Sequence, residues 1–257
     1  MHLRSANALS PWSTVVVCVC VVVALTGCQS APGAKGPAVA GEPEAASLPE
    51  GAIVLFGGTG TSKWTRMGSR SRPIRWVVED GALVCRPRSG NIQTRQAFGD
   101  CRLHLEFKVP HMPEAEKGSQ ARGNSGVFIQ GRYEVQILDS YEIGRPIQKN
   151  DCGALYNLIT PSKNACKPAG EWQTYDITFR APKFDESGKM TRKGRITVVQ
   201  NGITIIDDKE IPGTTPGGVD EDPKTPGLQY DPSKPGPLML QDHGNRVAFR
   251  NVWLVPL

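Results

Sequence analysis

Strict alternation of apolar and polar residues in two stretches constrains the fold of this chain more than any other feature. In RLHLEFKV, residues 102–109, every second residue is apolar, and TYDITFR, residues 174–180, repeats the pattern. A period of two places successive side chains on opposite faces of a β-strand. Both stretches are therefore predicted to be half-buried strands, each with one face in a hydrophobic core.

Shorter runs of the same kind indicate many more strands. They are predicted at Ile53–Phe56, Ile74–Glu79, Ala82–Cys85, Gly126–Gln130, Tyr133–Leu138, Arg195–Gln200, Ile203–Ile206, Leu238–Gln241 and Arg246–Val255. Turn-forming pairs such as Asp80-Gly81 and Asn201-Gly202 separate them, and no segment after residue 50 shows a sustained helical period. This pattern is typical of an all-β fold, a jelly-roll β-sandwich of two antiparallel sheets.

The N-terminus reads as a targeting segment. A short apolar run ends in Leu25-Thr26-Gly27-Cys28, which resembles a bacterial lipobox with Cys28 as the lipidated residue. Residues 1–27 are therefore interpreted as a lipoprotein signal peptide, with an uncleaved anchor helix as the alternative. Residues 28–50, rich in Ala, Pro and Gly, are predicted to be a disordered tether. The folded domain, residues 51–257, is then expected outside the cytoplasm, membrane-anchored on the periplasmic or outer-membrane side.

Charge and cysteine content exclude some functions and leave others open. The formal net charge of +5 comes from 30 basic and 25 acidic residues that are interspersed, so no nucleic-acid partner is indicated. Four cysteines fall in the folded part: Cys85, Cys101, Cys152 and Cys166. They allow three disulfide pairings, and closeness in sequence favours Cys85–Cys101 and Cys152–Cys166. A zinc site is the alternative, although no CxxC pair is present.

The stretch NSGVFIQGRYEVQILDSY, residues 124–141, reads as two strands joined at Gly131 and Arg132. If the apolar residues of the second strand face the core, Glu134 and Gln136 share the other face. The same parity gathers Asn124, Phe128 and Gln130 on the first strand. Amides and a carboxylate beside an aromatic ring suit sugar hydroxyls, whereas a solvated outer face is the alternative.

A second candidate cluster lies in LQDHGNRVAFRN, where two strands are predicted to meet at residues 242–245. His243 at such a hairpin tip could exchange protons with a ligand, or it could be an exposed turn residue. His104 lies on the polar face of its strand and could share the polar groove that Glu134 and the neighbouring amides would form, although a solvated position is favoured. A cluster of Glu134, Asp139 and Asp242 could act in glycosidic acid–base chemistry or bind a divalent cation. GxSxG, HExxH, P-loop and GxGxxG motifs are absent.

Several ordered blocks of the chain together resemble a known family. They are GNSGVFIQGRYEVQILDS, CGALYNLITPSKNACKPAGEWQTYDITF, ITVVQNGITI and GPLMLQDHGNRVAFRNVWL, with LFGGTGTSKW and WVVEDGALVC before them. This combination is similar to the 3-keto-disaccharide hydrolase family. The resemblance implies a concanavalin A-like sandwich and cleavage of glycosides already oxidised to the 3-keto form. It also implies a carbohydrate partner and β-elimination chemistry, with water addition giving net hydrolysis.

The resemblance also suggests roles for individual residues. His243 or Glu134 is expected as acid or base, with Arg250 or a bound divalent cation stabilising enolate charge. The residues expected to contact the sugar are Asn124, Gln136, Asp242 and Phe128. A non-catalytic carbohydrate-binding domain is the competing hypothesis, because the same fold serves lectins. A lipid-tethered surface interaction module is a third.

The long Pro- and Gly-rich segment at residues 212–237 exceeds the length of a hairpin turn. It is predicted to be an ordered insertion at the rim of the sandwich or a mobile lid.

Overall fold

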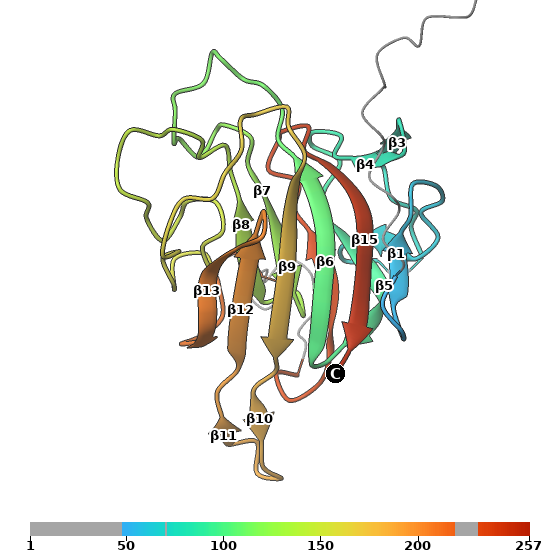
Figure 1. Cartoon of the computed structure of the whole chain (residues 1–257). Coiled ribbons are helices and arrows are strands. Elements are labelled where there is room, and N and C mark those ends of the chain that lie inside the picture. Colours follow the sequence, from blue (N-terminus) through green and yellow to red (C-terminus); the bar gives the residue numbers. More distant parts are fainter. Residues whose placement is uncertain (1–47, 70, 219–230) are drawn as a thin grey trace, which may run out of the picture. The chain divides into compact units, whose positions relative to one another are not determined.

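Two antiparallel sheets form the fold, in a computed structural model that describes residues 48–69, 71–218 and 231–257. The larger sheet has eight strands, and Figure 1 shows the green β6 beside the red β15 although they are far apart in sequence. In spatial order its strands are β13 (Ile203–Glu210), β12 (Arg195–Gln200), β9 (Gln173–Arg180), β6 (Cys101–Lys108), β15 (Ala248–Pro256), β4 (Ala82–Val84) and β3 (Val77–Glu79), and β1 (Ile53–Phe56) also pairs with β15.

The smaller sheet has five strands. In spatial order they are β2 (Trp64–Arg66), β5 (Ile92–Phe98), β14 (Gly236–Leu240), β7 (Ser125–Ile129) and β8 (Tyr133–Ile137). A separate two-stranded ribbon consists of β10 (Lys183–Phe184) and β11 (Met190–Arg192). No helix occurs in the part of the chain that the structure describes, so none there is long and apolar enough to cross a membrane.

The core lies between the two sheets and follows the alternation of the sequence. In β6 the apolar residues at positions 103, 105 and 107 are buried, and the residues between them face outward. In β8, Tyr133, Val135 and Ile137 belong to the same core. The ring of Tyr133 lies 5.3 Å from that of Phe179 in β9, which joins the two sheets directly. Each fully buried side chain of this kind contributes about 1.5–3 kcal/mol to stability. The predicted all-β jelly-roll sandwich is confirmed.

The predicted hairpin at residues 242–245 is wrong. β14 lies in the five-stranded sheet and β15 in the eight-stranded sheet, so the segment between them crosses from one sheet to the other. Strand β5 was not predicted, because its sequence IQTRQAF places polar residues at buried positions. The predicted signal peptide, Cys28 and most of the tether lie outside the described residues, and these assignments stay predictions.

The strand register excludes one of the two favoured disulfides. The N–H of Cys85 donates to the carbonyl of Val247, whereas Cys101 pairs with Pro256 at the other end of β15. Strand geometry separates such positions by roughly 30 Å, and a disulfide requires Cα atoms within about 7 Å. The Cys85–Cys101 pairing is therefore wrong, and all four thiols are free in the structure.

The other pair is close enough to react. Nε2 of Gln200 lies 3.6 Å from Sγ of Cys152 and 3.4 Å from Sγ of Cys166, so the two sulfurs share one donor. We expect oxidised glutathione to link Cys152 to the partly exposed Cys166, while Cys85 and Cys101, which are buried and too far apart to pair, stay reduced. Peptide mapping by mass spectrometry, with alkylation before and after unfolding, checks this result. A linked peptide containing Cys85 or Cys101, or none at all, contradicts it.

Candidate functional site

The β7–β8 hairpin places its polar residues on the outer face of the five-stranded sheet. Gln130 and Gly131 both have positive φ, 54° and 68°, and the N–H of Arg132 donates to the carbonyl of Ile129 at 3.1 Å. This turn geometry suits the twist of a two-stranded hairpin. It pairs residue 128 with Glu134 and residue 126 with Gln136. All four face away from the core, as the parity predicted.

A cavity of about 190 Å³ opens over this face. Its lining combines four residues singled out from the sequence, which are Asn124, Glu134, Gln136 and His243, with others that were not, which are Gln120, Tyr156, Pro216, Gly217 and Gln241. The structure therefore brings the proposed acid–base pair and two of the proposed sugar-binding amides to one place.

Glu134 is the dominant ionisable group of this pocket. Glu134 is only 2% exposed, and this burial raises the pKa of its carboxyl to about 8. Most molecules therefore carry a proton on Glu134 at neutral pH, and the group can donate a hydrogen bond. Its backbone N–H donates to Oγ1 of Thr215 at 2.9 Å, so the main chain is held as well.

Gly126 makes room for this carboxyl. A Cβ atom built on Gly126 would lie 2.1 Å from Oε1 and 2.8 Å from Cδ of Glu134, far inside van der Waals contact. The carboxyl thus occupies the space that a side chain on the neighbouring strand would fill. The missing Cβ therefore allows Glu134 to adopt this position.

Three buried amide oxygens surround the same cavity without a hydrogen-bond partner among the described residues. They are Oδ1 of Asn124, Oε1 of Gln136 and Oε1 of Gln241. An unsatisfied buried acceptor costs about 1–3 kcal/mol. Hydroxyl donors from a bound sugar would satisfy these oxygens, so the pocket is prepared for a polyhydroxylated ligand.

The two remaining walls are held by backbone hydrogen bonds. The N–H of Tyr156 donates to the carbonyl of Glu134 at 2.9 Å, which holds Tyr156 beside β8. On the other side, the N–H of Thr215 donates to the carbonyl of Arg132 at 2.9 Å, and Pro216 and Gly217 follow. Residues 212–218 of the predicted insertion thus include one wall of the pocket, and residues 219–230 lie outside the described part.

His243 reaches the pocket from the crossover between the sheets. The N–H of Asn124 donates to Oδ1 of Asn245 at 2.7 Å, which fixes this turn beside the start of β7. His243 itself is exposed and lines the cavity mouth. Asp242 does not line it: its carboxylate accepts from the N–H of Gly90 at 2.8 Å and of Gly244 at 3.0 Å. Asp242 stabilises the turn, and its role as a sugar-binding residue stays a prediction.

Phe128 is not a ligand contact either. It lies on the correct face but is 0% exposed, packed with Met239 and Met67 and covered by the Gly217 segment. It supports the floor of the pocket.

Arg250 lies on the other sheet and is excluded from the site. Phe249 beside it faces the core, so Arg250 faces outward from the eight-stranded sheet. Its Nε donates to Oε2 of Glu106 at 2.7 Å, and its guanidinium lies 4.2 Å from the ring centroid of Trp172. His104 occupies the same outer face, so neither residue meets the pocket. Arg250 therefore cannot stabilise an enolate in the pocket that holds Glu134 and His243.

The three-carboxylate cluster does not form. Asp139 makes an ion pair with Arg122, with Nε and Oδ2 2.6 Å apart, and Asp242 holds its turn, which leaves Glu134 alone. Within the described ranges, no group of three or more His, Cys, Asp and Glu residues could hold a metal ion.

Among the pocket residues that the sequence analysis did not predict, one could have been found from its pattern. Gln241 has the parity of Met239, which lies against Phe128 on the outer face of β14, so alternation could have placed it there. Gln120 and Tyr156 come from segments without periodicity, and no sequence pattern indicated them.

A family model described as a 3-keto-alpha-glucoside-1,2-lyase-like domain matches residues 51–255. The chain belongs to this family. Among solved structures, the lyase-like domain is similar to one described as a "putative glycosyl hydrolase" from Parabacteroides distasonis, with 38% identity, coverage of 81% of this chain and 85% of that chain, and a TM-score of 0.69. Another described in the same words, from the same organism, has 20% identity, coverage of 82% and 98%, and a TM-score of 0.56, and shows the fold alone.

No curated protein matches the lyase-like domain. Family membership and the 38% identical structure support a carbohydrate-active enzyme that cleaves glycosides.

Proposed function

We propose that the domain cleaves 3-keto-glycosides by β-elimination in the pocket around Glu134. The observation that carries this proposal is a buried carboxyl, protonated at neutral pH, in a cavity lined by unpartnered amide acceptors. Such a group transfers protons efficiently because its pKa lies close to the working pH. The family's description as 3-keto-alpha-glucoside-1,2-lyase-like supports the choice of substrate.

The chemistry requires one proton to leave and another to be supplied. The ketone at C3 acidifies the hydrogen on C2, and we assign its removal to the imidazole of His243 at the mouth of the pocket. The electron pair forms the C1–C2 double bond, and the C1–O bond breaks. Glu134 supplies the proton that the departing oxygen needs. Proton return from His243 to Glu134 through solvent restores both groups, and water addition to the enone gives net hydrolysis.

Removal of the C2 hydrogen places negative charge on the ketone oxygen. Because Arg250 lies outside the pocket, another group must donate a hydrogen bond to this oxygen. Tyr156 lines the pocket, and we assign its hydroxyl to this oxygen. A bound divalent cation is the alternative source of stabilisation. The two differ in one observable, because chelation should leave turnover unchanged when a phenol performs this role.

Incubation of the purified protein with 3-keto-glucosides, with and without chelator and added divalent metal, tests the proposal. We expect release of the aglycone together with absorbance of the enone, and the same rate in chelator. Sugar binding without release from any linkage would instead support a lectin-like module, for which the same amide acceptors would suffice.

A further inference from the structure

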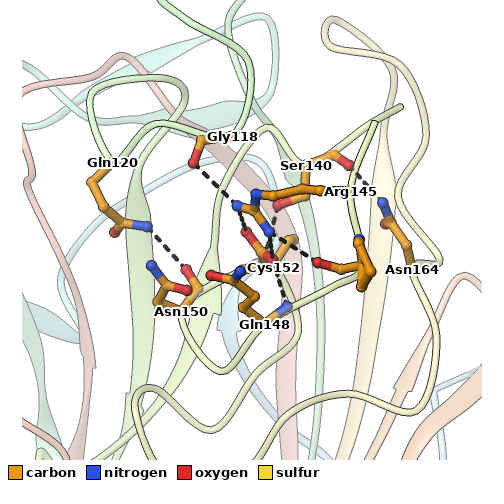
Figure 2. Close-up of polar contacts among 10 residues, drawn as sticks. Gly118, Gln120, Ser140, Arg145, Gln148, Asn150, Cys152 and Asn164 are labelled. Carbon is orange, nitrogen blue, oxygen red and sulfur yellow. Dashed lines mark hydrogen bonds and ion pairs between the residues drawn. The ribbon is translucent and has the colours of Figure 1, made fainter. Parts of the chain in front are cut away.

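Main-chain carbonyls dictate how the amide groups in the pocket are oriented. Nε2 of Gln120 donates to the carbonyl oxygen of Asn150 at 3.0 Å, a contact drawn in Figure 2. A carbonyl oxygen only accepts hydrogen bonds, so the NH₂ group of Gln120 must face it. Oε1 of Gln120 therefore faces the other two amides of the pocket.

This oxygen in turn fixes those two amides. Oε1 of Gln120 accepts from Nδ2 of Asn124 at 3.1 Å and from Nε2 of Gln136 at 3.2 Å. Nδ2 of Asn124 also donates to the main-chain carbonyl of Gln120 at 2.7 Å. Turning either amide by half a rotation would set two acceptors against each other. The oxygens of Asn124 and Gln136 are consequently the atoms left for a ligand, and both are buried without a partner among the described residues.

The main-chain carbonyl of Asn150 lies in a segment that is itself held by hydrogen bonds. Asp151, directly after Asn150, is fully buried and accepts from Nη1 of Arg145 at 2.7 Å, from Nη2 at 2.9 Å and from the N–H of Gln148 at 2.6 Å. Nη2 of Arg145 also contacts the carbonyl of Gly118 at 3.5 Å. Figure 2 shows one guanidinium joining the segment before Gln120 to the segment around Asn150. The carbonyl that orients Gln120 is thereby held in place.

We propose that Gln120 is a specificity-determining residue, which makes this side of the pocket accept hydrogen bonds and so selects sugars that present two free hydroxyl groups to Asn124 and Gln136. Gln120 acts by positioning, since the two oxygens it orients make the contacts. This inference rests on the proposed function and names the feature of the substrate that the pocket recognises, which is its free hydroxyl groups. A sugar lacking one of these hydroxyls leaves a buried acceptor unsatisfied, and it is rejected for that reason.

The test compares kcat/KM for a 3-keto-glucoside with kcat/KM for its 4-deoxy and 6-deoxy analogues. Wild-type protein should prefer the parent by at least about 100-fold over one analogue, because sites that bind a hydroxyl reject its absence strongly. Gln120→Met removes the oxygen that orients the amides, and the preference should fall to about tenfold or less. Gln120→Glu keeps an acceptor toward Asn124 and Gln136 but loses the donor to the carbonyl of Asn150, so it should restore only part of the preference.

Asn150→Ala is the matched control, because it removes a side chain but keeps the carbonyl that Gln120 uses. It should retain the full wild-type preference. If Gln120→Met does not fold, Gln120→Ala takes its place. Equal loss of kcat/KM for parent and analogues in the Gln120 variants would overturn the inference while leaving the proposed function intact. No turnover of any 3-keto-glucoside by the wild-type protein would overturn the proposed function itself.

Discussion

Replacement of Glu134 by glutamine is expected to lower kcat by about 10²- to 10⁴-fold while the affinity for sugar changes little. Glutamine has nearly the same shape and fits over Gly126, but it has no proton to give to a departing oxygen. Steady-state kinetics with a 3-keto-glucoside, and calorimetric titration with 3-keto-glucose as a product analogue, separate the two effects. Glu186→Gln, an exposed position next to the β10–β11 ribbon, is the control and should behave as wild type.

The pH profile gives the same prediction a second readout. Glu134 acts as a donor only while protonated, and its pKa is about 8. We therefore expect kcat/KM of the wild-type protein to fall as the pH rises through about 8. A Glu134→Gln variant with more than a tenth of wild-type kcat would remove Glu134 from the proton-donor role.

The second large effect of Glu134→Gln is on stability: the substitution that lowers activity is expected to raise the free energy of unfolding. Glutamine at position 134 is expected to stabilise the fold relative to wild type, by an amount that grows between pH 4.5 and about 8. Below this interval Glu134 is protonated in both the folded and the unfolded chain. Within it the unfolded chain loses the proton and the folded chain keeps it, so the free energy of unfolding of the wild type falls by about 1.4 kcal/mol per pH unit. Above about pH 8 the difference stays constant.

Urea unfolding of both proteins at pH 5, 6.5 and 8 measures this trend. Because glutamine does not titrate, the difference between the two proteins isolates the contribution of Glu134. A difference that is independent of pH would show that the carboxyl is not buried as the structure has it. Together, the two results would describe an active-site group that costs stability and supplies catalysis.

Alternation along single strands predicted most of the fold but only three of the nine residues that line the pocket. It placed Glu134 and Gln136 on one face because the core residues of β8 leave no other arrangement. It could not tell which sheet a strand joins, since that depends on pairing with distant strands. Arg250 follows a buried phenylalanine, so alternation is consistent with an outward-facing side chain, but only the pairing of β15 with β6 shows that it faces away from the pocket.

Long-range contacts explain the residues that were missed. Gln120 and Tyr156 belong to segments whose path is set by contacts across the sequence, such as Nε2 of Gln120 on the carbonyl of Asn150 and the N–H of Tyr156 on the carbonyl of Glu134. Neither contact leaves a period in the sequence. The crossover that brings His243 to the pocket was mistaken for a hairpin for a related reason, because a turn looks the same whether the chain returns to its own sheet or enters another.

The bare Cα of Gly126 has a consequence for the evolution of this site. With a Cβ only 2.1 Å from Oε1, position 126 cannot gain a side chain while Glu134 keeps its place. The two positions should therefore change together, and a homologue with a larger residue aligned to Gly126 should have abandoned the carboxyl. The residue aligned to Gly126 would then mark, from sequence alone, which copies of the domain have exchanged catalysis for binding.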